Sequence, residues 1–591
     1  MNLLKTVATV SGFTLLSRVT GLIREVITAG LFGASAATDA FFVAFRLPNL
    51  LRRLFAEGAF SQAFVPVLGQ TKARDGEAAA LALAHQVALL LFLALGVITL
   101  IGIAAAPILV LMMTGGYGGD LPREQLTIEM TQWMFPYIWM IGLVALASGV
   151  LNTWSRFKLP AFTPVLLNLS FIGCALLLAP QLDEPIWALV AAVLLGGILQ
   201  LGAQSFGLHR AGLLRGLPAL LRQPLRSTRE ALASEPVRRI LTLMLPASLA
   251  VSVAQVSLVI NTHIAARLEA GSVSWLSYAD RLMEFPTAML GVALGTVLLP
   301  TLSKAFGKQD IERAHALVDW GLRLVLLLAV PASVGLWVLS EPLAASLFHY
   351  GAFDAKDLAM TAWAMQSYAF GLLGLIAVKV LAPGFYAQQN IRTPVKIALV
   401  SLVVTQLLNV ITVPFLAHAG LALSTSLAAW VNAGLLLTFL IRKSGFRLAP
   451  GWMLLALRVV GSATAMGALL AWLALPIPWA DWQSTPFTRV GALFGLLAVA
   501  LTSMGSASPS LGCVGVRFSK DLRYEHNRLK RTGTGLPWWR EYGPGAHSGD
   551  AAHAQSSPAF TADHRHRAQC TRPRAAQGSV RGPGKYCRRR A

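Results

Sequence analysis

The chain has 591 residues, of which 55% are hydrophobic and only 13% are charged. Soluble globular domains carry about 25% charged residues, so a large soluble enzyme, a disordered scaffold and a secreted disulfide-rich miniprotein are excluded. Long apolar runs and a mean hydropathy of +0.61 indicate a polytopic membrane protein. The formal net charge is +22, but half of it lies from Arg517 onward and most of the rest lies in short loops, which does not indicate nucleic-acid binding.

Fourteen segments are apolar enough and long enough to span a membrane, which takes about 20 residues. The first, from about Val7 to Phe32, contains Arg18 and Arg24 and lacks a signal-peptide cleavage site. The second and eighth segments are weak because charges interrupt them. The predicted centres are Leu22, Ala56, Leu91, Ile141, Phe171, Leu195, Val253, Met289, Leu327, Leu373, Val403, Leu427, Ala465 and Leu496. The sequence therefore predicts an all-α polytopic integral membrane protein.

The charges of the loops predict the orientation of these helices. With the N-terminus in the cytoplasm, the six cytoplasmic loops hold 19 Lys and Arg residues, whereas the opposite loops hold three, Arg123, Arg267 and Lys356. Membrane proteins concentrate Lys and Arg in their cytoplasmic loops. We therefore expect both termini to lie in the cytoplasm.

A weak internal repeat divides the first twelve segments into two halves. Gly33 and Pro48 recur 238 residues later as Gly271 and Pro286, and a Thr-Pro-Val triplet recurs after 230 residues. Both prolines are expected to kink their helices and to open backbone groups. Two explanations fit this pattern, namely duplication of a six-helix unit and the general use of Gly and Pro at helix ends. We favour duplication.

The chain is expected to comprise five regions. They are a first lobe over 1–210, a basic cytoplasmic linker over 211–239, a second lobe over 240–442, two further helices over 443–506 and a basic tail over 507–591. The tail is rich in Arg, Gly, Pro, Ala, Ser and His and is expected to be disordered. Either it contacts anionic lipid at the cytoplasmic face, or it is an out-of-frame product of a GC-rich gene, which we favour.

Charged side chains inside the helices are the most informative feature. They gather in the first, second and eighth segments, where each costs about 2.5–3.5 kcal/mol at mid-bilayer. Three helices with this load are expected to line a water-filled cavity rather than to face lipid. The charged residues are Arg18, Arg24, Glu25, Asp39, Arg46, Arg52, Arg53, Glu57, Asp280, Arg281 and Glu284.

Two interpretations of these charges remain open. Spacing predicts the pairs Arg53–Glu57 and Arg281–Glu284, because residues three or four apart share a helix face. The two arginines of the first helix are six apart and point about 120° from each other, so they need partners from other helices. The charges either pair to hold the helices together, or present arginines to an anionic substrate, since arginine binds phosphate and carboxylate in bidentate geometry. We favour the substrate role.

The sequence contains no enzyme motif. The four cysteines have neither metal-ligand spacing nor a disulfide pattern. His85 and His263 lie near spanning segments without a ligand-spaced partner. A P-loop, a His-Glu-x-x-His motif and a nucleophile elbow are also absent. We therefore expect a protein that is not an enzyme and that carries no metal, cofactor or ATPase domain.

Five strings resemble the signature of the MurJ (MviN) family in the MOP exporter superfamily. They are Thr-Asp-Ala-Phe-Phe-Val-Ala-Phe at 38–45, the segments 47–53 and 55–66, Tyr-Ala-Asp-Arg-Leu-Met-Glu-Phe-Pro at 278–286, and the segment 379–386. The likeness extends from Met1 to about Leu501. It implies a lipid II flippase of peptidoglycan synthesis in the bacterial inner membrane that works by alternating access. It also implies two six-helix lobes around a central cavity, with two C-terminal helices that form a groove for the polyprenyl tail.

The resemblance implies roles for individual residues as well. Arg24, Arg52 and Arg281 would bind the diphosphate of lipid II. The cavity network and its gating pairs would comprise Arg18, Asp39, Arg53, Glu57, Asp280 and Glu284. The implied partners are lipid II, membrane lipids and the peptidoglycan synthesis machinery.

Two features depart from the family pattern. Some members bind sodium through carboxylates, but here the seventh, eleventh and twelfth helices contain no Asp or Glu within their spans, so the membrane potential is the expected driving force. The fourteenth helix loses its apolar character at about Leu501, which would leave the lipid groove incomplete. Two alternatives remain, namely another exporter of the superfamily, for polysaccharide-lipid or drugs, and a non-transporting membrane scaffold.

Overall fold

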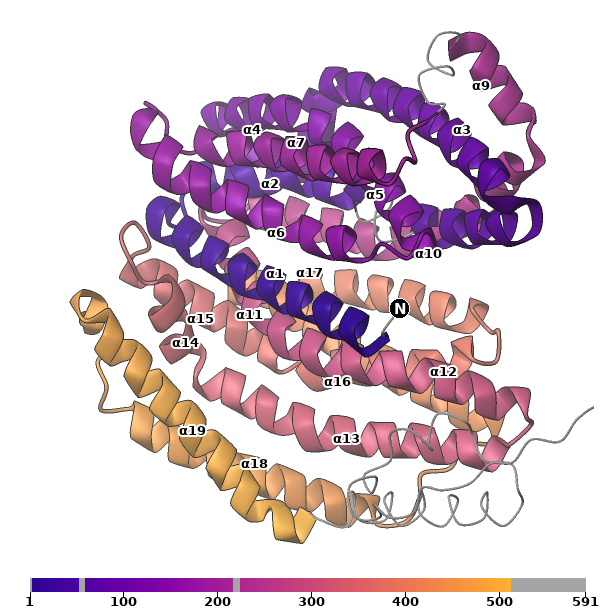
Figure 1. Cartoon of the computed structure of the whole chain (residues 1–591). Coiled ribbons are helices and arrows are strands. Elements are labelled where there is room, and N and C mark those ends of the chain that lie inside the picture. Colours follow the sequence, from indigo (N-terminus) through magenta and orange to yellow (C-terminus); the bar gives the residue numbers. More distant parts are fainter. Residues whose placement is uncertain (1–2, 53–58, 216–223, 512–591) are drawn as a thin grey trace, which may run out of the picture. The chain divides into compact units, whose positions relative to one another are not determined.

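The computed structural model describes residues 3–52, 59–215 and 224–511. Every regular element in these ranges is helical, as Figure 1 shows, so the predicted all-α fold is confirmed. The chain divides into two units, 1–517 and 518–591. The second unit lies outside the described residues, and so does nearly all of the predicted basic tail.

The helices α1 to α7 fall in the predicted first lobe, and we use that name for them. They are α1 (Leu3–Phe32), α2 (Ala36–Arg52), α3 (Ala59–Thr114), η2 (Gly115–Gly118), α4 (Leu121–Met134), α5 (Pro136–Thr153), α6 (Lys158–Gly173), η3 (Cys174–Leu178), η4 (Ala179–Gln181) and α7 (Trp187–Arg210). The predicted linker is partly helical, because it contains α9 (Pro224–Ala233) and the start of the next helix at Glu235.

The helices α10 to α17 fall in the predicted second lobe, and α18 and α19 form the C-terminal pair. They are α10 (Glu235–Ala266), α11 (Ser272–Pro286), η5 (Thr287–Val292), α12 (Ala293–Gly307), α13 (Ile311–Val338), α14 (Ser340–Phe348), α15 (Ala355–Ala369), α16 (Leu372–Tyr386), α17 (Arg392–Ser444), α18 (Trp452–Ala474), η6 (Asp481–Ser484) and α19 (Pro486–Leu511). Pro286 ends α11 and is followed directly by the π-helical turn η5, a distortion that often marks functional sites.

Eight of the described helical segments are long and apolar enough to cross a membrane, or nine if the bent pair α15–α16 is one span. Helices α3 and α17 each count once, although each contains a break, at Gly76 and Ala417 respectively. Thirteen of the fourteen predicted centres lie in helices, and the other, Ala56, falls outside the described residues. The exact number of fourteen membrane spans stays a prediction.

Large apolar side chains cover much of the outer surface. Phe415, Leu475 and Phe487 are 83%, 85% and 91% exposed, and they are three of many. A soluble monomer rarely exposes apolar patches larger than a few hundred Å², because water makes them costly. This surface therefore fits a surrounding of lipid.

The two lobes share local features that fit the duplication. Helix α4 begins at Asp120, whose carboxylate accepts from the N–H of Arg123 at 3.2 Å. Helix α15 begins in the same way at Asp354, which accepts from the N–H of Asp357 at 2.8 Å. The glycines at 33 and 271, which precede α2 and α11, both have positive φ. Such N-terminal caps and left-handed glycines fix where a helix starts.

The C-terminal pair packs on the second lobe through α13, as Figure 1 shows. Asp319 of α13 holds the start of α18, because its carboxylate accepts from the backbone N–H of Ala449 at 3.0 Å and from Nε1 of Trp452 at 2.7 Å. Arg323 pairs with Asp319 at 2.7 Å and donates to the backbone oxygens of Ala449 and Pro450. Helix α19 continues to Leu511, five residues beyond the predicted boundary at residue 506.

Candidate functional site

A charged cluster joins the first lobe to the second lobe. Glu25 of α1 forms an ion pair with its neighbour Arg24, and its Oε1 lies 3.0 Å from Nε of Arg281 on α11. The Glu25 side chain is only 8% exposed, so it needs these cations to offset the loss of water. The structure thus brings together Arg24 and Arg281, two of the three residues expected to bind the diphosphate.

The second lobe contributes a further carboxylate to this cluster. Glu284 lies one helical turn after Arg281, and its Oε2 is 2.9 Å from Nη1 of Arg281, which confirms the pair predicted from spacing. These two side chains are 51% and 44% exposed, respectively. Arg281 therefore has one nitrogen on a buried carboxylate and another on an exposed one, so an incoming anion would compete with Glu284.

Arg24 has a neutral partner that sequence reasoning missed. Oδ1 of Asn168 on α6 accepts from Nη1 of Arg24 at 3.2 Å. Nδ2 of the same amide donates to the backbone oxygen of Ser17 at 2.9 Å and to the hydroxyl of Thr20 at 3.1 Å. Asn168 therefore fixes both the guanidinium and the helix that carries it. A single Asn in an otherwise apolar run was the available signal, because polar side chains in such runs are costly unless they are partnered.

Asp39 joins the two lobes at another place. Its carboxylate is fully buried and accepts from the N–H of Gly271 at 2.8 Å, and from the N–H and the hydroxyl of Ser274 at 2.8 and 2.5 Å. Nη2 of Arg123 on α4 lies 2.5 Å from the same carboxylate. We counted Arg123 among the loop residues, but it lies buried in the first turn of α4. Asp39 therefore links α2 and α4 of the first lobe to the start of α11.

The remaining predicted residues are exposed or lie outside the described part, apart from Arg46. The side chains of Arg18 and Asp280 are exposed. Arg52 ends α2, and its side chain lies outside the described part. Arg53 and Glu57 lie outside the described residues, and so does their predicted pair. Arg46, one of the charges of the second segment, donates to the hydroxyl of Thr262 on α10 and so adds another contact between the lobes.

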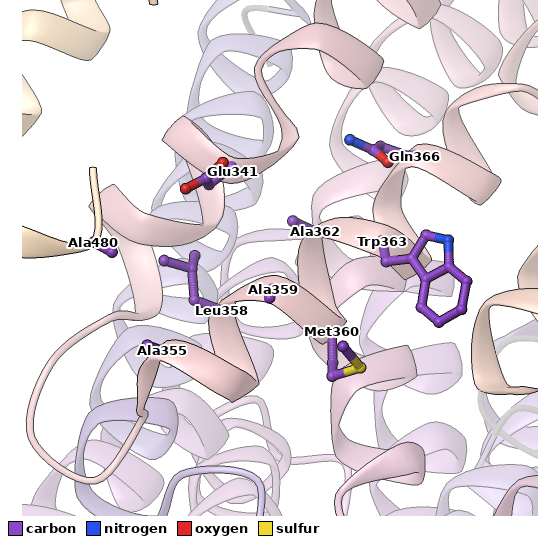
Figure 2. A pocket seen from close by; sticks show the side chains of 9 residues that line it. All are labelled: Glu341, Ala355, Leu358, Ala359, Met360, Ala362, Trp363, Gln366 and Ala480. Carbon is purple, nitrogen blue, oxygen red and sulfur yellow. The ribbon is translucent and has the colours of Figure 1, made fainter. Parts of the chain in front are cut away.

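Two cavities lie away from this cluster. The first, of about 400 Å³, is shown in Figure 2, where Glu341 of α14 and Trp363 and Gln366 of α15 lie among smaller apolar residues. The second, of about 550 Å³, lies between α10 and α17 and is lined by Gln406 and Asn409 with apolar residues. Neither is lined by the arginines, so the central cavity stays a prediction.

The described residues contain no group of three or more His, Cys, Asp or Glu that could hold a metal ion. Helices α10 and α17 meet through amides instead, since Oδ1 of Asn261 accepts from Nδ2 of Asn409 at 3.0 Å. The described side chains where α10 and α17 meet form no cluster of carboxylates that could bind sodium.

Known proteins resemble this chain over most of its length. The family model described as "Lipid II flippase MurJ" matches residues 28–484. The lipid II flippase MurJ of Burkholderia cenocepacia is 50% identical over 499 residues, which cover 84% of this chain and 95% of that protein. The probable lipid II flippase MurJ of Vibrio cholerae is 37% identical over 530 residues, covering 88% of this chain and 98% of the relative.

Solved structures resemble it in fold. A lipid II flippase MurJ in an inward closed conformation matches with a TM-score of 0.67 and 23% identity, over 85% of this chain and 99% of that one. An inward-facing multidrug transporter of the MATE family in the MOP superfamily matches with a TM-score of 0.58 and 14% identity, over 75% and 99% of the two chains. At these identities the likeness supports the fold alone.

Proposed function

The chain belongs to the lipid II flippase MurJ family, and from that premise we propose that it moves lipid II from the inner to the outer leaflet of the bacterial inner membrane. The relatives that carry this name match it over nearly their full length. Transport is required because a diphosphate linked to a sugar-peptide head group cannot cross hydrocarbon without shielding.

The observation that carries the proposal is the Arg24–Glu25–Arg281 cluster, which joins the two lobes. The diphosphate binds Arg24 and Arg281 in place of part of their contacts with Glu25 and Glu284. Because the two arginines come from different lobes, an anion that contacts both binds more tightly when the lobes approach. Such a ligand shifts the equilibrium between conformations by its difference in affinity for them.

The wider network serves access to this site. Arg52 adds a third cation for the diphosphate, while Arg18, Arg53, Glu57 and Asp280 complete the cavity. With the N-terminus in the cytoplasm, the contacts of Asp39 close the outer side, because α1 ends and α2 begins there. Alternating access breaks these contacts and closes the inner side. The membrane potential drives the cycle.

Lipid II transport in proteoliposomes tests the proposal. We expect the purified chain to flip labelled lipid II, and Arg24→Ala and Arg281→Ala to slow transport by roughly 10- to 100-fold, because charge-assisted hydrogen bonds contribute about 1.5–3 kcal/mol each. Arg74→Ala is the matched control, since this exposed arginine pairs only loosely with its neighbour Asp75, at 3.8 Å.

Replacement by lysine separates charge from geometry. Arg281→Lys keeps the charge but loses the forked donors that contact Glu25 and Glu284. We therefore expect its transport rate to lie between the rates of the wild type and of Arg281→Ala. Folded variants that lack either arginine and still flip at the normal rate would contradict the site. A folded wild-type chain that flips no lipid II would favour another superfamily exporter or a membrane scaffold.

A further inference from the structure

A further contact between the lobes lies beside that of Asp39. Asp357, in the first turn of α15, accepts from the backbone N–H of Ala34 at 3.0 Å and from Nε1 of Trp275 at 2.8 Å. Ala34 follows α1 in the first lobe, whereas Asp357 and Trp275 belong to the second lobe. Asp39 of the first lobe and Asp357 of the second lobe are both buried carboxylates. Each accepts a hydrogen bond from a backbone N–H close to the start of a helix in the other lobe.

The loop at 349–354 adds backbone contacts to this closure. The N–H of Ala352 donates to the backbone oxygen of Gly30 at 2.8 Å. A Cβ atom on Gly33 would lie 2.5 Å from the backbone oxygen of Ala352, so the two chains pack with no room for a side chain. Phe353 packs edge-to-face on Tyr278 of α11, with 5.6 Å between ring centroids. The loop therefore contacts both α1 and α11.

Arg489 of the C-terminal pair holds the same loop from its other side. This arginine is fully buried, three residues after the start of α19. Its Nη2 donates to the backbone oxygen of His349 at 2.9 Å, and its Cζ lies 4.6 Å from the ring centroid of Tyr350. No ion pair of Arg489 occurs among the described side chains, and its Nε and Nη1 have no hydrogen-bond partner there.

The cost of this arrangement argues for a role beyond packing. Burying a guanidinium with one hydrogen bond and no carboxylate is unfavourable, whereas an apolar side chain would pack there without that penalty. Burial, with Arg489 beside it, also lowers the pKa of the His349 imidazole, so this neighbour tends not to add a second positive charge. The main effect of Arg489 is therefore to fix the backbone of the loop at 349–354.

We propose that Arg489 is a positioning residue that couples the C-terminal pair to the closure between the lobes, acting through the loop at 349–354. A displacement of α19 moves the backbone of His349, and the loop transmits that movement to Gly30 of α1 and to Tyr278 of α11. The position of α19 in the membrane therefore biases the closed conformation. The inference rests on the alternating access of the proposed function.

Hydrogen–deuterium exchange of the full chain tests the coupling. In Arg489→Gln we expect exchange to rise by about tenfold in the loop and also in the segment 268–276, which holds the Asp39 contacts and does not touch Arg489. Arg489→Lys keeps a charged donor and should restore most of the protection. Thermal unfolding of each variant shows whether the chain is still folded.

Arg323→Gln is the matched control, because it weakens the other anchor of the C-terminal pair, at α13 and α18. We expect it to raise exchange near α18 and to leave 268–276 unchanged. If Arg489→Gln raises exchange in the loop at 349–354 but not in 268–276, the proposal is overturned. It is also overturned if exchange rises uniformly along the chain and Arg323→Gln gives the same result. Both results are independent of lipid II transport, so failure here is distinguishable from failure of the proposed function.

Discussion

At the scale of single residues, the charged cluster depends on contacts between helices far apart in the chain. Asn168 lies 144 residues from Arg24, yet it holds the guanidinium and the backbone of α1 together. Because Asn168 is neutral, it orients Arg24 without reducing its charge. An arginine that must bind an anion needs this kind of support, since a rigid donor loses less entropy when it binds.

A double-mutant cycle tests the role of Asn168. We expect Asn168→Leu to slow lipid II transport, though less than Arg24→Ala does, because the charge remains while its orientation is lost. The double variant should transport no more slowly than Arg24→Ala alone, since both changes act through one guanidinium. Transport rates in proteoliposomes give the coupling. Additive effects of the two changes would show that Asn168 acts independently of Arg24.

Of the two contacts within a helix that spacing predicted, the one on described residues is confirmed, whereas the partners between helices were not identified. Arg281 and Glu284 are three apart, so helix geometry alone brings them together. The ion pair of Asp39 with Arg123 bridges 84 residues, and no spacing rule applies to it. Arg123 was assigned to a loop because it is charged and lies just before an apolar run. Its burial depends on a partner that only the fold supplies.

At the scale of elements, close helix packing depends on glycine at defined positions. A Cβ atom on Gly374 of α16 would lie 2.9 Å from backbone atoms of Ala429 and Trp430 on α17. Backbone atoms cannot move aside as a flexible side chain can. Gly434 on α17 has nothing within 4 Å of the same hypothetical atom. Two helical glycines in neighbouring elements thus face opposite environments.

Alanine at these two positions should therefore have opposite effects. Gly374→Ala is expected to destabilise the fold by roughly 1–3 kcal/mol, because it forces α16 and α17 apart. Gly434→Ala should leave stability unchanged or raise it by up to about 1 kcal/mol, since alanine favours helix more than glycine does. Thermal unfolding of the purified protein in detergent measures both. Equal midpoints for the two variants would refute the packing argument.

Apolar runs located the helices well, but the last helix continues beyond the apolar run that predicted it. The predicted end of α19 followed the loss of apolar residues, yet the helix continues through Thr502 and Ser503 to Leu511. The hydroxyls of these two residues donate to backbone oxygens of the preceding turn, at 2.9 and 3.0 Å. Such bonds let polar residues remain helical. Hydropathy reports the environment of a segment, not its backbone hydrogen bonds, so the difference was not visible from the sequence.

At the scale of the whole molecule, two of the five strings that identified the family contribute to the junction between the lobes. The string at 38–45 supplies Asp39, and the string at 278–286 supplies Arg281 and Glu284. Both strings lie where helices of opposite lobes meet, and Asp39 and Arg281 each have more than one partner. Family membership was therefore readable from the sequence, whereas the contacts of Asp39 and the contact of Arg489 with the backbone of His349 required the fold.

The direction of transport depends on which face the Asp39 contacts close, and loop charge predicts the outer face. Single cysteines at Asp183 and Lys308, both exposed, test this orientation in intact cells. The chain should end at Leu511, which removes Cys513, Cys570 and Cys587, and the buried Cys174 should become serine.

We expect a membrane-impermeant maleimide to label Asp183→Cys in intact cells, and Lys308→Cys only after permeabilisation. A cysteine at Arg74, which is also exposed, is the control within the first lobe and should behave like that at Lys308. The reverse pattern would place the Asp39 closure on the cytoplasmic side. The structure would then be open to the outer leaflet. Lipid II would have to enter from the cytoplasm by breaking the Asp39 contacts, which we propose to break when lipid II is released.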